Sequence, residues 1–192
     1  MNHPAELKVH QYMSDAVNGK STMSEEVIDQ VGNDVKDALR KQFGGGNQRG
    51  EFRLRMSNLG RPTCQLWFEK NKPELASPKP NNFMINMMLG DIVEAVFKGL
   101  LRGAGVKYEE PEHVSLDVDG TTISGTYDLV VDGAVDDVKS ASGWSYDNKF
   151  VNYETLRDGD AFGYVSQLIG YAKAAKKKIG GWWVVNKANG KF

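Results

Sequence analysis

Residues 121–140 read TTISGTYDLVVDGAVDDVKS. Asp132-Gly133 stands between two runs rich in β-branched residues, and Asp-Gly in such a setting is a strong signal for a two-residue β-hairpin. If these two residues form the loop, Val131 pairs with Ala134, and the register of the other pairs follows. The stretch therefore predicts an antiparallel hairpin whose facing residues can be named in advance.

Three charged side chains of this hairpin are expected to lie together on one face of the sheet. In the predicted register Asp128 lies directly opposite Asp137, and opposed residues point to the same side. Lys139 follows Asp137 by two positions on the same strand, so it joins that face. Two facing carboxylates repel each other, and a divalent cation between them removes the penalty. Oxygen ligands without His or Cys indicate Mg²⁺ or Mn²⁺ rather than Zn²⁺.

A second interpretation of the same hairpin involves no metal. The acidic side chains then face solvent, and Lys139 only neutralises Asp137. A one-residue bulge would also shift the register and separate Asp128 from Asp137. Spacing alone leaves both interpretations open.

The segments around the hairpin predict an α/β (α+β) fold with a central mixed sheet. Asp119-Gly120 is a further turn signal, which extends the hairpin to an antiparallel three-strand meander. Its strands are expected over residues 114–118, 122–131 and 134–140.

Helices are expected on both sides of the meander, over residues 83–102 and 160–178. In the first, an apolar stripe recurs at helical spacing and consists of Ile85, Leu89, Ile92, Val96 and Leu100. The Trp- and Tyr-rich segment before the second helix reads as a loop. Gly180-Gly181 is expected to turn the chain into a last strand over residues 182–185. At the other end, residues 1–47 are expected to form a helical arm, and residues 48–192 the core.

The composition limits the kinds of protein that the chain can be. It has 192 residues and a formal net charge of -1. Residues 108–137 hold nine acidic and no basic side chains, whereas residues 44–107 and 138–192 each carry a net charge of +5. Such an acidic segment is either a set of solvated loops and strand edges, or a cation site flanked by surfaces that attract an anionic polymer.

The cysteine content and the hydropathy exclude further classes of protein. Cys64 is the single cysteine, so neither a disulfide framework nor an iron–sulfur cluster built by this chain alone is expected. No run of about 18 apolar residues suggests a membrane span. The start, MNHPAELKVHQ, lacks the apolar core of a signal peptide, and we expect a cytoplasmic protein without a membrane partner.

Four sequence elements, in this order, resemble the PD-(D/E)XK nuclease superfamily over roughly residues 57–185. Gly90-Asp91-Ile92-Val93-Glu94 resembles the helix that supplies the first acidic residue or His. Gly125-Thr126-Tyr127-Asp128, followed by Asp137-Val138-Lys139-Ser140, is similar to the superfamily signature. Gln167-Leu168-Ile169-Gly170-Tyr171 matches the Q-x-x-x-Y motif of the RecB-type branch, which includes phage exonucleases.

The sequence departs from the family pattern at three positions. Tyr127 stands where the family has the Pro of its name, and Asp137 stands where Glu is commoner. Glu94 stands where many RecB-type members have His, although other branches have Glu there.

The resemblance implies a restriction-endonuclease-like core that binds Mg²⁺ or Mn²⁺. The ligands it implies are Asp128, Asp137, Glu94 and the backbone carbonyl of Val138. Lys139 would orient a water molecule or help to deprotonate it, and would stabilise charge on the phosphate. Gln167 and Tyr171 would contact the substrate or support the site.

The same resemblance implies a DNA nuclease, and we expect an exonuclease acting on DNA ends in bacterial or phage recombination, repair or DNA degradation. Basic and polar residues near the motifs are candidate DNA contacts. These are Arg53, Arg55, Arg61, Ser140 and Lys173. A structure-specific endonuclease and a non-catalytic DNA-binding module of the same fold remain alternatives. The setting would be the cytoplasm of a bacterium or phage-infected host, and the oligomeric state stays open.

Overall fold

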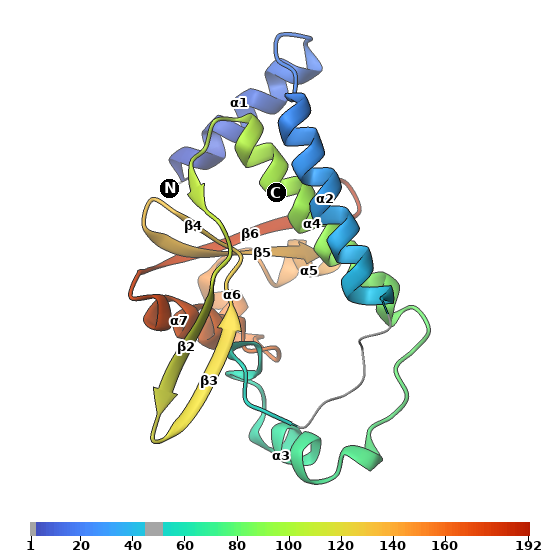
Figure 1. Cartoon of the computed structure of the whole chain (residues 1–192), viewed down its shortest axis with the longest axis vertical. Helices are drawn as coiled ribbons and strands as arrows, with labels where there is room; N and C mark the ends of the chain where they lie inside the picture. Colours follow the sequence, from blue (N-terminus) through green and yellow to red (C-terminus); the bar gives the residue numbers. More distant parts are fainter. Residues whose placement is uncertain (1–2, 45–51) are drawn as a thin grey trace. The chain divides into compact units, whose positions relative to one another are not determined.

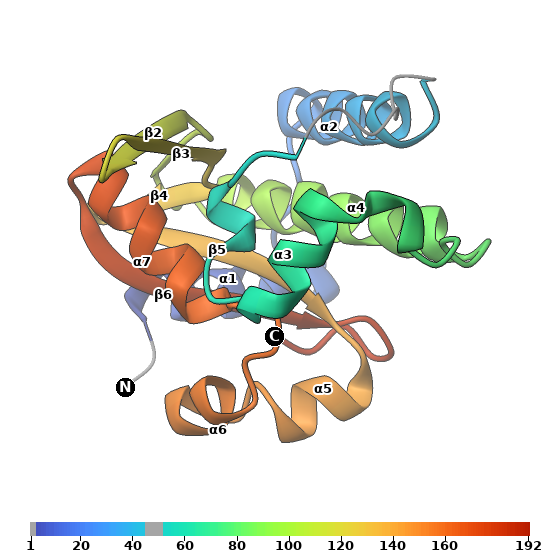
Figure 2. The same cartoon turned by 90° about the horizontal axis from the view of Figure 1, so that it is seen from below.

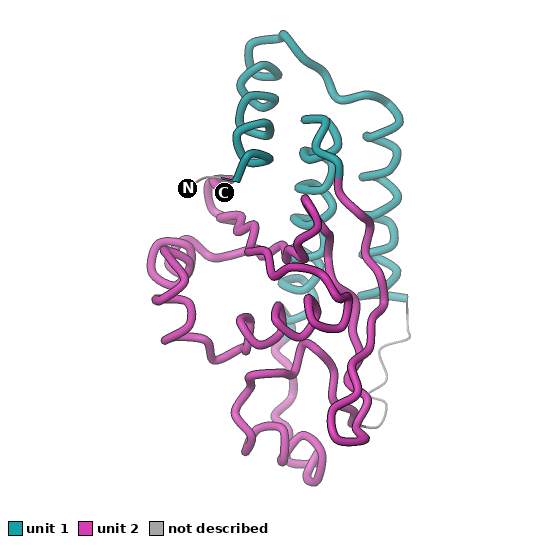
Figure 3. Tube along the Cα trace, turned by 90° about the vertical axis from the view of Figure 1, so that its left-hand side faces the viewer, with its two compact units in different colours: residues 1–48, 81–107 teal, residues 49–80, 108–192 magenta. Residues whose placement is uncertain are grey.

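A computed structural model describes residues 3–44 and 52–192 of the chain. The protein has mixed α and β structure, as expected, and divides into two compact units (Figure 3). Unit 1 comprises residues 1–48 and 81–107, and unit 2 comprises residues 49–80 and 108–192. The expected N-terminal arm thus lies in unit 1, which also includes a segment that was expected in the core.

Unit 1 contains the helices α1 (Pro4–Val17), α2 (Glu25–Phe43) and α4 (Phe83–Gly103), and α4 packs against both of the others. Glycines on α4 permit these close approaches. A Cβ at Gly99 would lie 2.4 Å from Cγ2 of Val31 on α2. A Cβ at Gly103 would lie 2.7 Å from Cζ of Tyr12 on α1.

The helix expected over residues 83–102 is confirmed, but its buried face is not the expected one. Ile85, Leu89 and Val96 of the predicted apolar stripe are 45%, 40% and 46% exposed. The buried positions include Ala95 and Lys98 instead. Phe97, Gly99 and Leu101 are buried as well, so the buried positions differ from the stripe that apolar spacing predicts.

Unit 2 is built on a mixed sheet with the strand order β1-β4-β5-β6. The strand β6 runs parallel to β5, and the other neighbours are antiparallel. A separate hairpin, β2–β3, lies beside this sheet (Figure 1). The bounds are β1 (Tyr108–Glu109), β2 (His113–Val118), β3 (Thr121–Thr126), β4 (Leu129–Val131), β5 (Ala134–Ala141) and β6 (Lys178–Asn186).

The continuous meander expected over residues 114–140 is wrong. Its middle strand breaks at Tyr127 and Asp128, so that β3 belongs to one sheet and β4 to another. The ring of Tyr127 is buried, and its hydroxyl donates a hydrogen bond to Glu112 at 3.1 Å. The carboxylate of Asp128 accepts a hydrogen bond from the backbone of Val138 at 2.8 Å. A side chain thus bonds to β5 just beyond the point where the β4 ladder ends.

The helices of unit 2 include one that was expected and others that were not. The expected second helix is α7 (Tyr164–Ala175), which packs on β5 and β6 (Figure 2). Shorter helices occupy segments expected to be loops or left unassigned. They are η1 (Met56–Asn58), α3 (Thr63–Asn71), η2 (Pro73–Leu75), α5 (Gly143–Asn148) and α6 (Tyr153–Asp158).

Apolar side chains from η1, β3, β4, β5 and α7 form the core of unit 2. Val135 of β5 packs there with Leu168 and Tyr171 of α7. Because residues two apart on a strand share a face, Asp137 and Lys139 continue the face of Val135 that α7 covers. The same packing that buries the core therefore brings α7 over the charged part of β5.

Gly180 and Gly181 do not form the expected turn but lie inside β6. Val135 pairs with Ile179 and Asp137 pairs with Trp182, so β6 contains one extra residue opposite Asp136. This is a β-bulge, and the side chain of Asp136 fills it. The carboxylate accepts hydrogen bonds from the backbone of Gly181 at 2.7 Å and from Nε1 of Trp183 at 3.1 Å.

Within the described ranges, no helix is both long enough and apolar enough to cross a bilayer.

The bulge predicts opposite outcomes for two adjacent glycines. A Cβ at Gly180 would lie 1.9 Å from Oδ1 of Asp136 and 2.6 Å from the carbonyl oxygen of Val135, whereas a Cβ at Gly181 would meet nothing within 4 Å. Gly180→Ala should lower the free energy of unfolding by about 3 kcal/mol. Gly181→Ala should change it by less than about 0.5 kcal/mol. Equilibrium unfolding in urea measures both, and equal losses would contradict the bulge.

Candidate functional site

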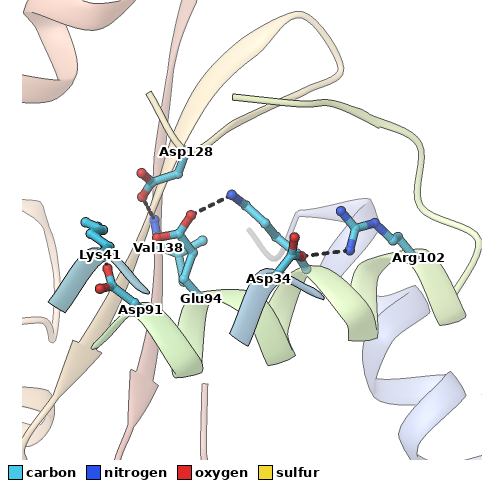
Figure 4. A network of polar contacts seen from close by, with 8 residues as sticks. Asp34, Lys41, Asp91, Glu94, Arg102, Asp128 and Val138 are labelled. Carbon is cyan, nitrogen blue, oxygen red and sulfur yellow. Dashed lines mark hydrogen bonds and ion pairs between the residues drawn. The ribbon is translucent and has the colours of Figure 1, made fainter. Parts of the chain in front are cut away.

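The hairpin register that the sequence predicts is confirmed. Val131 pairs with Ala134, and Leu129 pairs with Asp136. Asp132 and Gly133 both have positive φ, at 49° and 77°, as the predicted two-residue turn requires. The ladder ends at Leu129, so the predicted pairing of Asp128 with Asp137 is not part of it. Asp128 lies one position beyond the ladder, where its Oδ2 accepts the hydrogen bond from the backbone nitrogen of Val138 (Figure 4).

Asp137 and Lys139 form an ion pair on the face of β5 that α7 covers. Their Oδ2 and Nζ atoms lie 2.5 Å apart, and the two side chains are 5% and 20% exposed. Burial on its own lowers the pKa of Lys139, but the charges of Asp137 and Asp128 outweigh it and raise the pKa above its ordinary value. The lysine is therefore an ammonium held by two carboxylates.

The expected pairing of Gln167 with Tyr171 is present on α7. Nε2 of Gln167 lies 3.5 Å from the hydroxyl of Tyr171, as two residues four apart on one helix face allow. Burial raises the pKa of Tyr171, and its hydroxyl also senses the charges of Asp128, Asp137 and Lys139. The predicted residues of β5, α7 and the β3–β4 junction therefore come together in unit 2.

Tyr164 is a site residue that the sequence analysis missed. Nζ of Lys139 lies over its ring at 5.2 Å from the centroid, a cation–π contact. Tyr164 begins α7, three residues before Gln167 and seven before Tyr171, so it shares their helix face. Extending the Q-x-x-x-Y spacing one turn toward the N-terminus would have found it.

The adjacent carboxylates Asp136 and Asp137 have different surroundings. Asp136 points to the opposite face of β5, where Gly181 and Trp183 donate hydrogen bonds to it. Asp137 instead pairs with Lys139, whose ammonium is also stabilised by the charge of Asp128. Alternation along the strand thus assigns Asp136 to the β6 bulge and Asp137 to the candidate site.

Glu94 belongs to unit 1, whereas the other predicted ligands belong to unit 2. It lies half-buried on α4, and its carboxylate accepts a hydrogen bond from Nζ of Lys98 at 2.5 Å (Figure 4). Lys98 is itself buried, so Glu94 balances an ammonium within its own helix. Two other ion pairs join α2 and α4 in this unit, from Lys41 to Asp91 and from Arg102 to Asp34.

The predicted DNA contacts occupy different parts of unit 2. Arg61 lies close to the site, because the preceding Gly60 packs against the start of α7 and the Arg61 charge acts on Tyr164. Ser140 follows Lys139 on β5, and Lys173 is exposed two positions after Tyr171, on another side of α7. Arg53 and Arg55 are exposed in the segment before η1. The backbone of Arg55 forms an isolated β-bridge with Ser124 of β3.

The donor atoms of the site suit a hard divalent cation. Asp128 and Asp137 supply carboxylate oxygens, and Lys139 offsets only one of their two negative charges. Among the described residues of unit 2, no third His, Cys, Asp or Glu joins them in a group of metal-binding size.

Comparisons with known proteins bear on the fold alone. No protein-family model matches the sequence, and no curated protein matches it significantly. One solved structure that does match is the crystal structure of SSO0001, with a TM-score of 0.50 and 16% sequence identity. The match covers 82% of this chain and 73% of that one.

The different surroundings of the two adjacent carboxylates predict different effects on stability. Asp136→Asn places an amide donor against the donors of Gly181 or Trp183 and should lower the free energy of unfolding by about 2–3 kcal/mol. Asp137→Asn should cost less than half as much, because Asp128 still balances Lys139 and the repulsion between the carboxylates disappears. Urea unfolding of the two isosteric variants provides the comparison. A larger loss for Asp137→Asn would show that Asp137 is the structural residue.

Proposed function

We propose that this protein is a metal-dependent deoxyribonuclease with a restriction-endonuclease-like core, similar to the RecB-type branch of the PD-(D/E)XK superfamily. The observation that carries the proposal is the convergence of Asp128, Asp137 and Lys139 at the β3–β4 junction and on β5. The signature of that superfamily requires this grouping. A solvated acidic hairpin would not place Asp137 at 5% exposure against a lysine that α7 also covers.

The residues present suit a magnesium or manganese ion. Asp128, Asp137 and the backbone carbonyl of Val138 would hold it. When bound, the ion supplies Lewis-acid polarisation of the phosphodiester and lowers the pKa of a water molecule. It also offsets the negative charge that Lys139 leaves unbalanced.

Lys139 is suited to act on the phosphate as a cation. Its raised pKa keeps the ammonium protonated, so it can donate hydrogen bonds to a phosphoryl oxygen and stabilise the negative charge that develops there. The cation–π contact with Tyr164 and the ion pair with Asp137 restrict the direction in which Nζ points. Orientation of the amine is thus established before substrate arrives.

The hydroxyl of Tyr171 and the amide of Gln167 add neutral hydrogen-bonding groups beside these charges. Both groups come from α7, whose register on β5 the apolar core determines. They are placed to orient a water molecule or a substrate oxygen without adding charge. The Q-x-x-x-Y resemblance favours action on DNA ends, hence an exonuclease of bacterial or phage recombination, repair or DNA degradation.

End-labelled linear and covalently closed circular DNA, each single- and double-stranded, test the proposal. Linear DNA alone should be degraded with Mg²⁺ or Mn²⁺, and EDTA should abolish the reaction. Asp137→Ala and Lys139→Ala should each lower the rate at least a hundredfold, roughly the effect of removing a group that stabilises developing charge.

Asp147→Ala and Lys187→Ala are the matched controls, since both side chains are exposed in unit 2 outside the site. They should keep the parent rate. Cutting of closed circles would change the assignment to an endonuclease. Binding without cleavage under any metal would favour a non-catalytic DNA-binding module, and cleavage that survives both site variants would place the active site elsewhere.

The role proposed for Tyr171 separates its hydroxyl from its ring. The ring packs in the core, whereas the hydroxyl makes only a long contact with Gln167. Tyr171→Phe should therefore leave the free energy of unfolding within about 0.5 kcal/mol of the parent and slow cleavage about tenfold. Tyr127→Phe is the control: it removes a different buried hydroxyl, which donates a hydrogen bond to Glu112, and should leave the cleavage rate unchanged. Equal rates for the Tyr171→Phe variant and the parent would exclude a role for this hydroxyl.

A further inference from the structure

An aromatic cluster formed by Phe150, Phe162 and Tyr164 adjoins the proposed active site. Tyr164 is its centre: the ring of Phe162 stacks on it at 5.6 Å between centroids and 23° between planes, and that of Phe150 lies 5.9 Å away. The ammonium of Lys139 also contacts Tyr164. Through Tyr164, the cluster therefore contacts a group that is proposed to bind phosphate.

Phe162 is the exposed member of this aromatic cluster. It is 55% exposed, although it stacks on a ring that is half-buried. Exposed apolar rings are common singly and need no explanation by themselves. An exposed ring that already stacks in near-parallel geometry, beside a cation, is a surface on which another flat ring can extend the stack.

The loop that carries Phe162 is held firmly in place. The carboxylate of Asp160 accepts hydrogen bonds from the backbone nitrogens of Tyr164 and Val165 at 2.8 and 2.9 Å. Gly163 has a φ of 75° and packs so closely that a Cβ would lie 1.8 Å from the carbonyl oxygen of Leu59. The ring of Phe162 is thus presented by a preorganised loop, which lowers the entropy lost on binding.

Positive charge lies beside the aromatic cluster as well. Burial raises the pKa of Tyr164, and the positive charges of Lys139 and Arg61 oppose that rise, whereas the carboxylates of Asp137 and Asp160 add to it. Arg61 follows Gly60, whose Cβ position is 2.8 Å from Cα of Gly163. Its ion pair with Glu69 is long, at 4.0 Å, and leaves the guanidinium only weakly held. A flat ring on Phe162 would therefore have cations available for the phosphate attached to it.

We propose that Phe162, backed by the ring of Tyr164, stacks an unpaired nucleobase next to the cleavage site, so that the protein selects single-stranded or frayed DNA. This inference rests on the proposed nuclease function and names the substrate class of that site. A base inside a duplex has both faces covered by its neighbours, whereas an unpaired base offers a face to an aromatic side chain. Arg61 and Lys139 neutralise the phosphates on either side of the stacked base.

The test measures DNA binding apart from cleavage. In an Asp137→Asn background with Mg²⁺, fluorescence anisotropy compares a labelled single strand with the blunt duplex of the same sequence. Adding Phe162→Ala should weaken binding of the single strand roughly 5- to 150-fold, the range for one base–aromatic stack, and binding of the duplex less than about twofold. Phe162→Trp should preserve binding of the single strand.

A second readout reports the stack directly. A single 2-aminopurine near the end of the strand should lose fluorescence when the Asp137→Asn protein binds. The double variant Asp137→Asn, Phe162→Ala should not cause this loss. Phe43→Ala is the matched control: it removes a ring of similar exposure, 52%, from α2 of unit 1. It should leave both readouts at the parent values.

Three results of the binding experiments would overturn the inference. They are parent-like binding of the single strand by the Phe162→Ala protein, an equal loss on the duplex, or the same loss for Phe43→Ala. Cleavage by the chain with Asp137 intact is scored separately. If the protein cuts no DNA but binds the single strand in a way that depends on Phe162, the nuclease proposal alone is refuted. If cleavage requires metal but is unaffected by Phe162→Ala, this inference alone is refuted.

Discussion

The hydrogen bond from the backbone of Val138 to the carboxylate of Asp128 is the interaction on which unit 2 depends most. A backbone donor on β5 must be paired, and here a side chain accepts its hydrogen bond beyond the end of the β4 ladder. This exchange lets the chain leave one sheet and enter another at Tyr127 and Asp128. It also holds the Asp128 carboxylate where its negative charge acts on Lys139. One bond thus separates the β2–β3 hairpin from the mixed sheet and assembles the charged group.

Adjacent side chains of β5 point to opposite faces, so one residue has a structural role and the next has a candidate functional role. Val135, Asp137 and Lys139 face α7, passing from apolar core to charge along one line of the strand. Asp136 faces the other way and stabilises the bulge of β6. The bulge accommodates one extra residue before Trp182, after which parallel pairing resumes opposite Asp137. A structural carboxylate therefore supports the strand next to the carboxylate proposed to bind metal.

The start of α7 joins these features to the surface. Its first residue, Tyr164, touches Lys139 on one side and the exposed ring of Phe162 on another. Asp160 and Gly163 hold the preceding loop so that the helix can begin there. The proposed chemistry and the proposed selection of unpaired bases therefore share a single rigid corner of unit 2, formed where the apolar contact between α7 and β5 ends.

The hairpin register, the shared helix face of Gln167 and Tyr171, and the existence of α4 and α7 could be predicted from the sequence. Each of these follows from local spacing, because a two-residue turn or a helical period places neighbours without reference to the rest of the chain. The break at Tyr127, the bulge at Gly180, the buried face of α4 and the place of Tyr164 over Lys139 could not be predicted from it. These depend on contacts between segments distant in sequence, where one buried hydrogen bond or one close backbone approach outweighs local propensity.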